Sequence, residues 1–347
     1  MKKAIILILL LSLILTTACS LLQGENTEPP EETEESPQEE EELEPEEPEY
    51  TNFSIFNGQG ISDDQETYQA IGIMVENHAA ARPHSALGLA DIVYETAVET
   101  YTITRFMAIY ASEHPDKIGP VRSARIPFVR MIQEWGLPYA YYGSAARARG
   151  DAKSLIQSLN IPMRFDGHLG INDEFYSRDN SRRAPHNAFF NAEAAMTKIP
   201  ALEYEKHFNF DEETNIKEDD ISRLDLRYSS SNQVSYEYDQ ENRNYQRFIN
   251  NEPMMDTYMD DQITVRNIIV QHAPHIMVEA DNYVLVDFLG EGKAEYFIDG
   301  KYEEGTWKKA DHQTPTEFFG KYGSPITLIP GNTWIQVVHK NVEIDMD

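Results

Sequence analysis

The chain of 347 residues contains a single cysteine, Cys19, and this scarcity excludes several kinds of chemistry. One thiol cannot close an intramolecular disulfide, and it cannot provide the paired thiolates of a structural zinc site. Cys19 also lies at the end of an apolar N-terminal run, where acylation would consume the thiol. The folded part of the protein must therefore be stabilised by its core alone.

Basic residues are also scarce, since 29 Lys and Arg stand against 59 Asp and Glu, for a formal net charge of −30. An acidic chain of this kind argues against nucleic acid as a partner. The N-terminal apolar run from Ala4 to Leu15 is interrupted only by Ser12. It is too short to span a bilayer as a helix, but it suits the apolar segment of a signal peptide.

The start of the chain predicts export and a lipid anchor. Met1-Lys2-Lys3 forms a short positive segment before the apolar run, and Leu15-Thr16-Thr17-Ala18-Cys19 resembles a bacterial lipobox. We therefore predict a signal peptide over residues 1–18 and lipidation of Cys19. The membrane is then one partner, and the protein lies on the extracytoplasmic face. The alternative is a plain secretory signal followed by a stray cysteine.

Residues 19–50 are predicted to be a disordered tether. From Glu25 to Tyr50 the chain holds 14 glutamates and 5 prolines, and Leu43 is its only aliphatic residue. Such a composition buries too little apolar surface to offset the entropy of ordering. Beyond the tether we predict an N-terminal αβ domain over 51–205, a polar linker over 206–233 and a C-terminal, mostly β domain over 234–347.

The pattern of apolar residues predicts an α+β or α/β fold for the first of these domains. Residues 70–76, 90–99, 103–111, 118–122 and 138–142 have the composition of strands. Apolar residues at helical spacing over 128–135 predict a helix that begins between Ser123 and Pro127 and that Gly136 ends. Further helices are predicted after Ser144 and over 191–199. After residue 233 the helical period disappears, and strands alternate with Gly-containing turns, which predicts a smaller domain of hairpins.

Positive charge is concentrated in one part of this acidic chain. Residues 105–186 carry twelve Lys and Arg against eight Asp and Glu. Within them GPVRSAR (119–125) joins a predicted strand to a predicted helix, and a helix N-terminus attracts anions. Arginine offers a planar fork that matches phosphate or carboxylate. We therefore predict that Arg105, Arg122, Ser123 and Arg125 bind an anion. Alternatively, these arginines pair with carboxylates such as Asp91 or Glu95.

A second polar stretch, YSRDNSRRAPHN (176–187), has the residue types of a binding loop. Arg178 and Arg182 would recognise an anion, His186 would transfer a proton near neutral pH, and Asn187 would orient the ligand. The alternative is a solvated loop held by Asx turns and Arg–Asp pairs. Glu76 and Asn77 close the first predicted strand, where α/β proteins often place ligand contacts. His186 and Asp91 are the candidate catalytic residues.

Several familiar sites are missing from the sequence. It contains no G-x-S-x-G, S-x-x-K, phosphate-binding P-loop or H-E-x-x-H motif. His272 and His275 do not form a helical ligand pair, because Pro274 breaks the helix that would align them. We therefore predict no metal site and no cofactor.

Four stretches resemble the YerB family of Gram-positive lipoproteins. They are IMVENHAAARPHSALGLADIVYE (73–95), ITRFMAIY (103–110), KIGPVRSAR (117–125) and RAPHN (183–187). The resemblance covers about residues 68–345 and implies a two-domain lipoprotein of the cell envelope without an assigned activity. In outline, ADIVYE and the arginine-bearing junction are also similar to the LytR–CpsA–Psr phosphotransferases, an analogy of pattern alone.

Three functions follow from these observations. In the first, the N-terminal domain binds an anionic envelope ligand that bears phosphate or carboxylate. In the second, the same residues catalyse phosphoryl transfer or hydrolysis on lipid-linked or wall-polymer phosphates. In the third, the C-terminal domain is a scaffold for an envelope protein. That scaffold would use aromatic residues: Tyr296, Phe297, Trp307, Phe318, Phe319 and Trp334.

Overall fold

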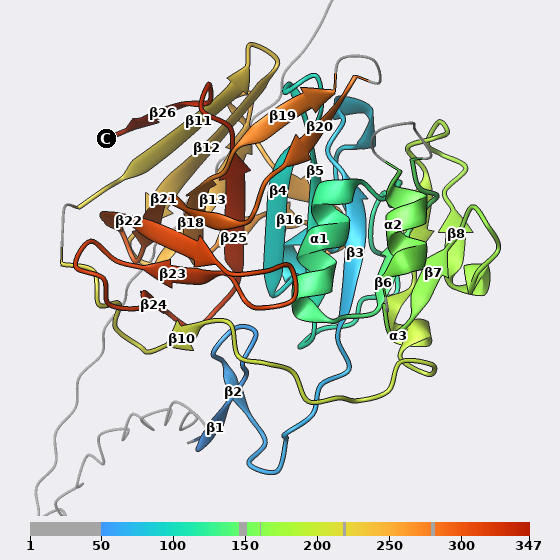
Figure 1. The fold of residues 1–347 in the computed structure, drawn as a ribbon, viewed down its shortest axis with the longest axis horizontal. Coiled ribbons are helices and arrows are strands. Elements are labelled where there is room, and N and C mark those ends of the chain that lie inside the picture. The colour runs from blue at the N-terminus through green and yellow to red at the C-terminus, as the bar shows by residue number, and fades with distance from the viewer. Residues whose placement is uncertain (1–49, 146–150, 160, 218–219, 279–281) are drawn as a thin grey trace, which may run out of the picture. The chain divides into compact units, whose positions relative to one another are not determined.

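A mixed ten-stranded sheet forms the centre of the computed structural model, which describes residues 50–145, 151–159, 161–217, 220–278 and 282–347 (Figure 1). The signal peptide, Cys19 and nearly all of the predicted tether lie outside these residues. In spatial order the strands are β23 (Glu317–Phe319), β22 (Lys301–Lys309), β21 (Gly290–Ile298), β18 (Asn267–His272), β25 (Thr333–Val338), β4 (Ile92–Glu99), β5 (Ile103–Tyr110), β3 (Ile71–Glu76), β6 (Tyr139–Tyr141) and β7 (Arg164–Asp166).

The prediction of an α+β or α/β first domain is wrong, because the described structure is mostly β. Its α-helices are α1 (Ile126–Trp135), α2 (Ala152–Ser158) and α3 (Ala192–Ala195). Only α1 is long, and it ends where the sequence predicts, with Gly136 in the left-handed conformation at φ 63°. α3 is shorter than predicted. Of the helix predicted after Ser144, residues 146–150 lie outside the described residues, and α2 is the part that the structure describes. Elsewhere the described residues hold short 3₁₀ segments and loops, so helices do not cover both faces of the sheet.

Seven strands of the large sheet run in the same direction, and this places one end of each along a shared edge. β18 is parallel to β25, β25 to β4, β3 to β6, and β6 to β7. β5 is antiparallel to both β4 and β3, so these two are parallel to each other. β21 is antiparallel to both β18 and β22, so β22 also runs in this direction. The carboxyl ends of all seven strands therefore lie at one edge.

A second sheet packs against one face of the first. It contains β14 (Glu252–Pro253), β13 (Asn244–Ile249), β12 (Asn232–Asp239), β11 (Arg223–Ser229) and β26 (Glu343–Met346), and β17 (Thr264–Val265) also pairs with β13. One core cluster joins Ile73, Val93 and Phe106 of the large sheet to Leu226 and Tyr236 of the second. A second cluster joins the opposite face to α1. We call the face of the large sheet that packs against the second sheet the sheet face, and the face that packs against α1 the α1 face.

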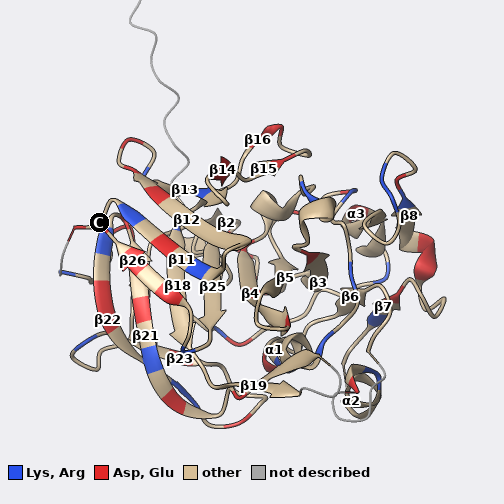
Figure 2. Ribbon diagram, turned by 90° about the horizontal axis from the view of Figure 1, so that it is seen from above, with Lys and Arg blue, Asp and Glu red and all other residues tan. Residues whose placement is uncertain are grey.

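Five two-stranded pairs complete the fold. They are β1 (Asn52–Phe53) with β2 (Gly60–Ile61), β8 (Tyr176–Arg178) with β9 (Ala188–Phe190), β10 (Asn209–Phe210) with β24 (Thr327–Leu328), β15 (Met255–Asp256) with β16 (Asp261–Gln262), and β19 (His275–Val278) with β20 (Tyr283–Val286). Acidic and basic segments alternate along β21 and β22 at one side of the molecule (Figure 2). By contrast, the central strands β3, β4 and β5 are almost entirely buried.

Candidate functional site

Glu76, the last residue of β3, brings together two of the predicted stretches. Its carboxylate accepts a hydrogen bond from Arg122 Nε at 2.9 Å and another from His186 Nδ1 at 2.7 Å. Glu76 is only 4% exposed. Strand alternation explains its position, since Met74 and Gly72 on the same side of β3 pack toward α1. A residue from the GPVRSAR junction and one from the 176–187 loop therefore meet at the end of one strand.

Glu99 is the second carboxylate of the site. It lies 3.4 Å from Arg105 NH2 and 2.8 Å from Arg125 NH2. The pairing of β4 with β5 shifts between Ala97 and Glu99, which is a β-bulge. A bulge re-aims the side chains that follow it. Glu99 consequently reaches the α1 face, where Arg105 and Arg125 lie.

Arg105 is buried between these two carboxylates. It is directly opposite Glu76 in the pairing of β5 with β3, and its NH1 donates to the Ser123 carbonyl at 2.8 Å. Burial lowers the pKa of Arg105 to about 9, and the neighbouring Arg125 contributes to the shift. The guanidinium group stays charged at neutral pH. Burial acts in the opposite direction on Glu99, but Arg105 and Arg125 outweigh it and hold its pKa below the ordinary value.

Arg122 differs from its two neighbours because part of it reaches solvent. Its side chain is 27% exposed, and its ion pair with Glu76 uses Nε. Among the contacts of the described residues, its two terminal nitrogens form no hydrogen bond or ion pair. The outer edge of the guanidinium group is therefore available to a planar or tetrahedral anion.

The 176–187 loop brings only some of its predicted residues to Glu76. The ring of His186 stacks on that of His78, with centroids 5.0 Å apart. Arg178 instead donates to Asn187 Oδ1 at 2.6 Å and lies over the Tyr142 ring at 4.5 Å. Arg182 donates to the carbonyls of Ala81 and Pro83. Arg182 thus ties this loop to the loop after β3.

Ser123 has a structural contact, since its hydroxyl donates to the Tyr142 carbonyl at 2.9 Å. The candidate catalytic residue Asp91 lies apart from the arginines. It precedes β4 at the opposite end of that strand from Glu99. Its carboxylate accepts hydrogen bonds from Asn57 and from the backbone of Ala111 and Ser112. Burial raises the pKa of Asp91. The carboxylate of Asp91 therefore holds neighbouring segments of the chain together, which is a structural role.

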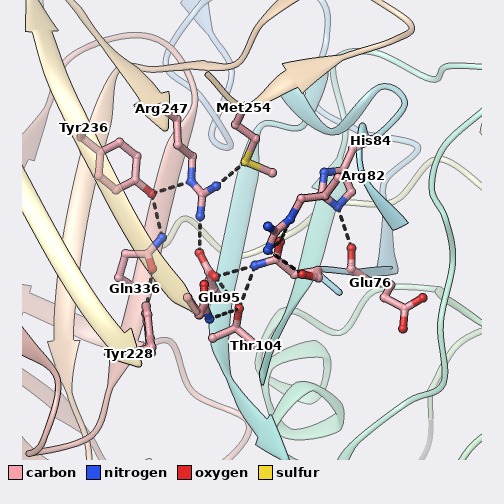
Figure 3. A network of polar contacts seen from close by, with 12 residues as sticks. Glu76, Arg82, His84, Glu95, Thr104, Tyr228, Tyr236, Arg247, Met254 and Gln336 are labelled. Carbon is pink, nitrogen blue, oxygen red and sulfur yellow. Dashed lines mark hydrogen bonds and ion pairs between the residues drawn. The ribbon is translucent and has the colours of Figure 1, made fainter. Parts of the chain in front are cut away.

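Asn77 joins a different network, of which Figure 3 shows Glu95 and Arg247. Its amide donates to Glu95 and Thr104, and Arg82 donates to its side-chain oxygen. Glu95 in turn pairs with Arg247 of β13 at 2.6 Å, and both side chains are fully buried. Glu95 therefore does not neutralise the predicted arginines, because strand alternation places it on the face opposite Arg105.

The site thus holds three guanidinium groups and one imidazole around two carboxylates on the α1 face. We call Glu76, Glu99, Arg105, Arg122, Arg125 and His186 the arginine cluster. Its two carboxylates form ion pairs with the three arginines. Three guanidinium groups against two carboxylates leave one positive charge in excess. The sequence did not single out Glu99, because its role depends on a bulge. Tyr142 was also missed, since only the fold places it beside Arg178. His78 follows Glu76 and Asn77 in the sequence, but only the fold places its ring on that of His186.

Two other properties of the described residues bear on function. No group of three or more His, Cys, Asp or Glu is placed to hold a metal ion there. In the same residues, no helix is long and apolar enough to cross a membrane.

The aromatic side chains considered for a scaffold surface are mostly core, since Tyr296, Phe297, Trp307, Phe318 and Trp334 are buried. They do not form an exposed aromatic patch.

Comparison with known proteins places the chain among proteins without an assigned activity. The protein-family model described as "Protein of unknown function (DUF3048) N-terminal domain" matches residues 56–205. The family model of the corresponding C-terminal domain matches residues 224–335. The "Putative lipoprotein YerB" of Bacillus subtilis (strain 168) is 29% identical over 280 residues, which are 77% of this chain and 80% of the relative. A crystal structure of the YerB protein from Bacillus subtilis matches with a TM-score of 0.72 at 25% identity. That match covers 85% of this chain and 99% of the solved one.

Proposed function

The chain belongs to the DUF3048 family, and from this premise we propose that its arginine cluster binds an anionic ligand of the cell envelope. The resemblance to YerB-like proteins is confirmed by the two matching domains and by the relative. The relative's name supports a lipoprotein. In the proposal, Cys19 carries the lipid and the tether holds the folded part on the extracytoplasmic side of the membrane.

The observation that carries this proposal is that only Nε of the Arg122 guanidinium group is paired, with Glu76, among the contacts of the described residues. Glu76 fixes the group through Nε, and the opposite edge points away from that ion pair with both terminal nitrogens available. A phosphate or carboxylate accepts two parallel hydrogen bonds from such an edge. The excess positive charge of the cluster adds an attraction for the ligand.

Titration calorimetry with methyl phosphate and with acetate tests the proposal and separates the two anion classes. Arg122→Gln should weaken binding by about 1.5–3 kcal/mol, the value of a hydrogen bond to a charged group, or roughly 10- to 150-fold in Kd. Arg130→Gln is the matched control, since Arg130 lies on α1 and contacts Gln133. Its affinity should equal that of the parent. Absence of binding by both anions at low salt would refute the proposal.

A second function is favoured by one specific contact, the hydrogen bond from His186 Nδ1 to Glu76. A carboxylate that holds one nitrogen of an imidazole leaves the other nitrogen to accept or donate a proton, as in acyl-transfer triads. His186 would then act as general acid or base on a phosphate ester bound at Arg122. Turnover of a pyrophosphate-linked lipid that is lost in His186→Asn and kept in His78→Asn would support catalysis. No turnover by the parent protein would exclude this chemistry for that substrate.

A further inference from the structure

A cavity of about 460 Å³ shares no lining residue with the arginine cluster. Its volume is within the roughly 300–1,000 Å³ of small-molecule sites. Three of its lining residues, Phe208, Phe318 and Ile326, belong to the core cluster on the α1 face. We call it the His207 cavity, and its lining comes from residues 205–209, 310, 314–315, 317–319 and 325–326. It therefore lies between the segments that lead into β10, β23 and β24.

Glu134, His207 and Lys309 form a buried polar group beside this cavity. Their side chains are 5%, 3% and 1% exposed. Lys309 Nζ lies 2.8 Å from Glu134 Oε2, and the backbone N–H of Thr316 donates to Oε1 at 2.6 Å. Burial alone would raise the pKa of Glu134, but His207 and Lys309 outweigh it and hold that pKa below its ordinary value. The carboxylate is therefore charged at neutral pH, and Lys309 supplies its counter-charge.

The imidazole ring of His207 is held between this carboxylate and an indole ring. It stacks on the Trp135 ring with the centroids 3.5 Å apart, and its Nδ1 lies 3.6 Å from Glu134 Oε1. In the neutral imidazole the proton therefore lies on Nδ1, toward the carboxylate, and Nε2 carries the lone pair. Among the contacts of the described residues, Nε2 forms no hydrogen bond. Because His207 lines the cavity, this acceptor is available to a ligand there.

The exposed part of the cavity lining is negatively charged overall. Its charged residues are Glu205, Lys206 and Glu317, and all three are exposed. Two carboxylates against one ammonium group leave one negative charge in excess. Among the contacts of the described residues, neither carboxylate is in an ion pair. The cavity therefore attracts a cation and repels an anion.

The remaining walls of the cavity suit an aliphatic chain. Its apolar lining residues include Phe208, Pro315, Phe318, Pro325 and Ile326. A primary ammonium group has three N–H donors and no acceptor. It therefore matches a lone pair on an imidazole and two carboxylates, whereas a carboxylate or phosphate ligand has no donor for Nε2.

We propose that the His207 cavity binds a primary ammonium group on an aliphatic chain, such as the side chain of a lysine in a peptide. The ammonium group donates to His207 Nε2 and is attracted by Glu205 and Glu317, while the chain packs on the apolar walls. This site is independent of the proposed anion site, because the two share no residue and their ligands have opposite charges.

Titration calorimetry on the full chain in non-ionic detergent micelles tests the site. N-acetyl-lysine N-methylamide carries the ammonium group on a peptide unit, and n-butylamine carries it alone; both should bind. N-acetyl-norleucine N-methylamide has the aliphatic chain of lysine without the ammonium group, and tetramethylammonium has the charge without an N–H donor. Each should bind more weakly than its ammonium counterpart by about 10-fold or more, the effect of a lost hydrogen bond to a charged group.

Substitutions show whether the ligands bind in the cavity. Glu317→Gln should weaken the binding of both ammonium ligands by about 2- to 5-fold, the effect of an exposed ion pair. Glu343→Gln is the matched control and should keep the parent affinity, since Glu343 is an exposed carboxylate that pairs with Arg227. His207→Phe keeps an aromatic ring on Trp135 and removes the Nε2 acceptor, so it should weaken binding by about 10-fold or more. If this variant does not fold, the ¹⁵N resonance of His207 Nε2 in the parent protein should shift when n-butylamine is added.

The outcomes decide the proposal independently of the anion site. Equal binding of N-acetyl-norleucine N-methylamide would refute it, and so would affinities that neither His207→Phe nor Glu317→Gln changes. An unshifted Nε2 resonance at saturating n-butylamine, or no binding of either ammonium ligand, has the same meaning. Binding of n-butylamine without the lysine analogue supports the ammonium site and assigns it to a free amine. Arg122→Gln should leave all these affinities unchanged, so that failure of one proposal does not affect the other.

Discussion

At the scale of single residues, the ion pair between Arg247 and Glu95 is the most deeply buried charge pair described, because neither side chain has exposed surface. Arg247 also donates to the Tyr236 hydroxyl and lies 4.7 Å from the Trp334 ring. Burial alone would lower the pKa of Arg247, but Tyr236 and Glu95 leave it above its ordinary value. Each charge in this pair depends on the other.

Glu95→Gln should therefore destabilise the protein by about 3–5 kcal/mol, because it leaves a buried guanidinium group without a counter-charge. Urea unfolding followed by circular dichroism measures the change. Glu304→Gln is the matched control, since Glu304 pairs with Lys293 on the surface and is 59% exposed in its side chain. That variant should lose less than about 1 kcal/mol. Equal effects of the two substitutions would contradict the argument.

His84 predicts a specific dependence of stability on pH. Burial, aided by Arg82, Arg247 and Arg182, lowers the pKa of His84 to about 3, although its hydrogen bond to the Glu76 carbonyl opposes the shift. Below about pH 6.5 the unfolded chain binds a proton that the folded chain does not. The stability that neutral His84 contributes to the folded state is therefore fully present above pH 6.5. It falls by about 1.4 kcal/mol for each pH unit toward pH 3.

Urea unfolding of the parent and of His84→Gln at pH 7, 6 and 5 checks this contribution. Glutamine keeps a donor for the Glu76 carbonyl and removes the titrating ring. The loss of stability with falling pH should be smaller in the variant by the equivalent of one proton. His275, which titrates in the same range, is present in both proteins and cancels in the comparison. Parallel pH profiles would show that His84 does not titrate as argued.

At the scale of elements, the sequence predicts the strands better than the way they are combined. Alternating apolar residues correctly locate β3, β4 and β5, and helical spacing correctly locates α1. The helix predicted over 191–199 is reduced to α3, because a short apolar run does not fix a period. The bulge that turns Glu99 toward Arg105 depends on the pairing of two strands. Such a feature leaves no local signal in the sequence.

The same limit applies to the site. The stretches GPVRSAR and APHN give Arg122 and His186, which the structure brings to one carboxylate. Composition and spacing also suggested Asp91, Arg178 and Arg182, yet these contact backbone groups or other side chains elsewhere. Which residues of a polar loop converge is decided by the strands that carry the loop ends. A linear pattern does not contain that information.

The edge strand β23 depends on Gly305 in β22. A Cβ atom added at Gly305 would lie 2.1 Å from the Phe319 carbonyl oxygen, which is backbone and cannot rotate away. Gly305→Ala should therefore destabilise the protein by about 1–3 kcal/mol, the usual effect of overpacking. Hydrogen exchange should show β23 losing protection before other strands. Gly323→Asn is the control, because Gly323 has open space and a φ of 83° that asparagine tolerates. A larger effect at Gly323 would refute this account.

At the scale of the whole molecule, the two family domains share one sheet. β25 lies beyond residue 330, yet it is paired with β4 on one side and with β18 on the other. Residues 49–347 accordingly form one compact unit. The matched domains, 56–205 and 224–335, divide the chain in sequence but not in hydrogen bonding.

We therefore expect residues 49–347 to unfold in a single transition. Circular dichroism should report the same urea midpoint as the fluorescence of Trp135, Trp307 and Trp334, which lie in both halves of the chain. Residues 50–205 alone should not fold, because β4 loses its partner β25. Two separate midpoints, or a stable isolated first half, would contradict this expectation. Residues 50–347 prepared in the same buffer are the control for the truncation.

The late position of β25 also sets when the molecule is able to fold during its synthesis. The edge of β4 has emerged from the ribosome long before residues 333–338 have been translated, and it has no partner until then. Domains normally begin to fold from the N-terminal side as they emerge. Here the central sheet cannot close until residues 333–338 are available to pair with β4. A nascent chain of this design therefore keeps one side of β4 without its strand partner through most of its synthesis.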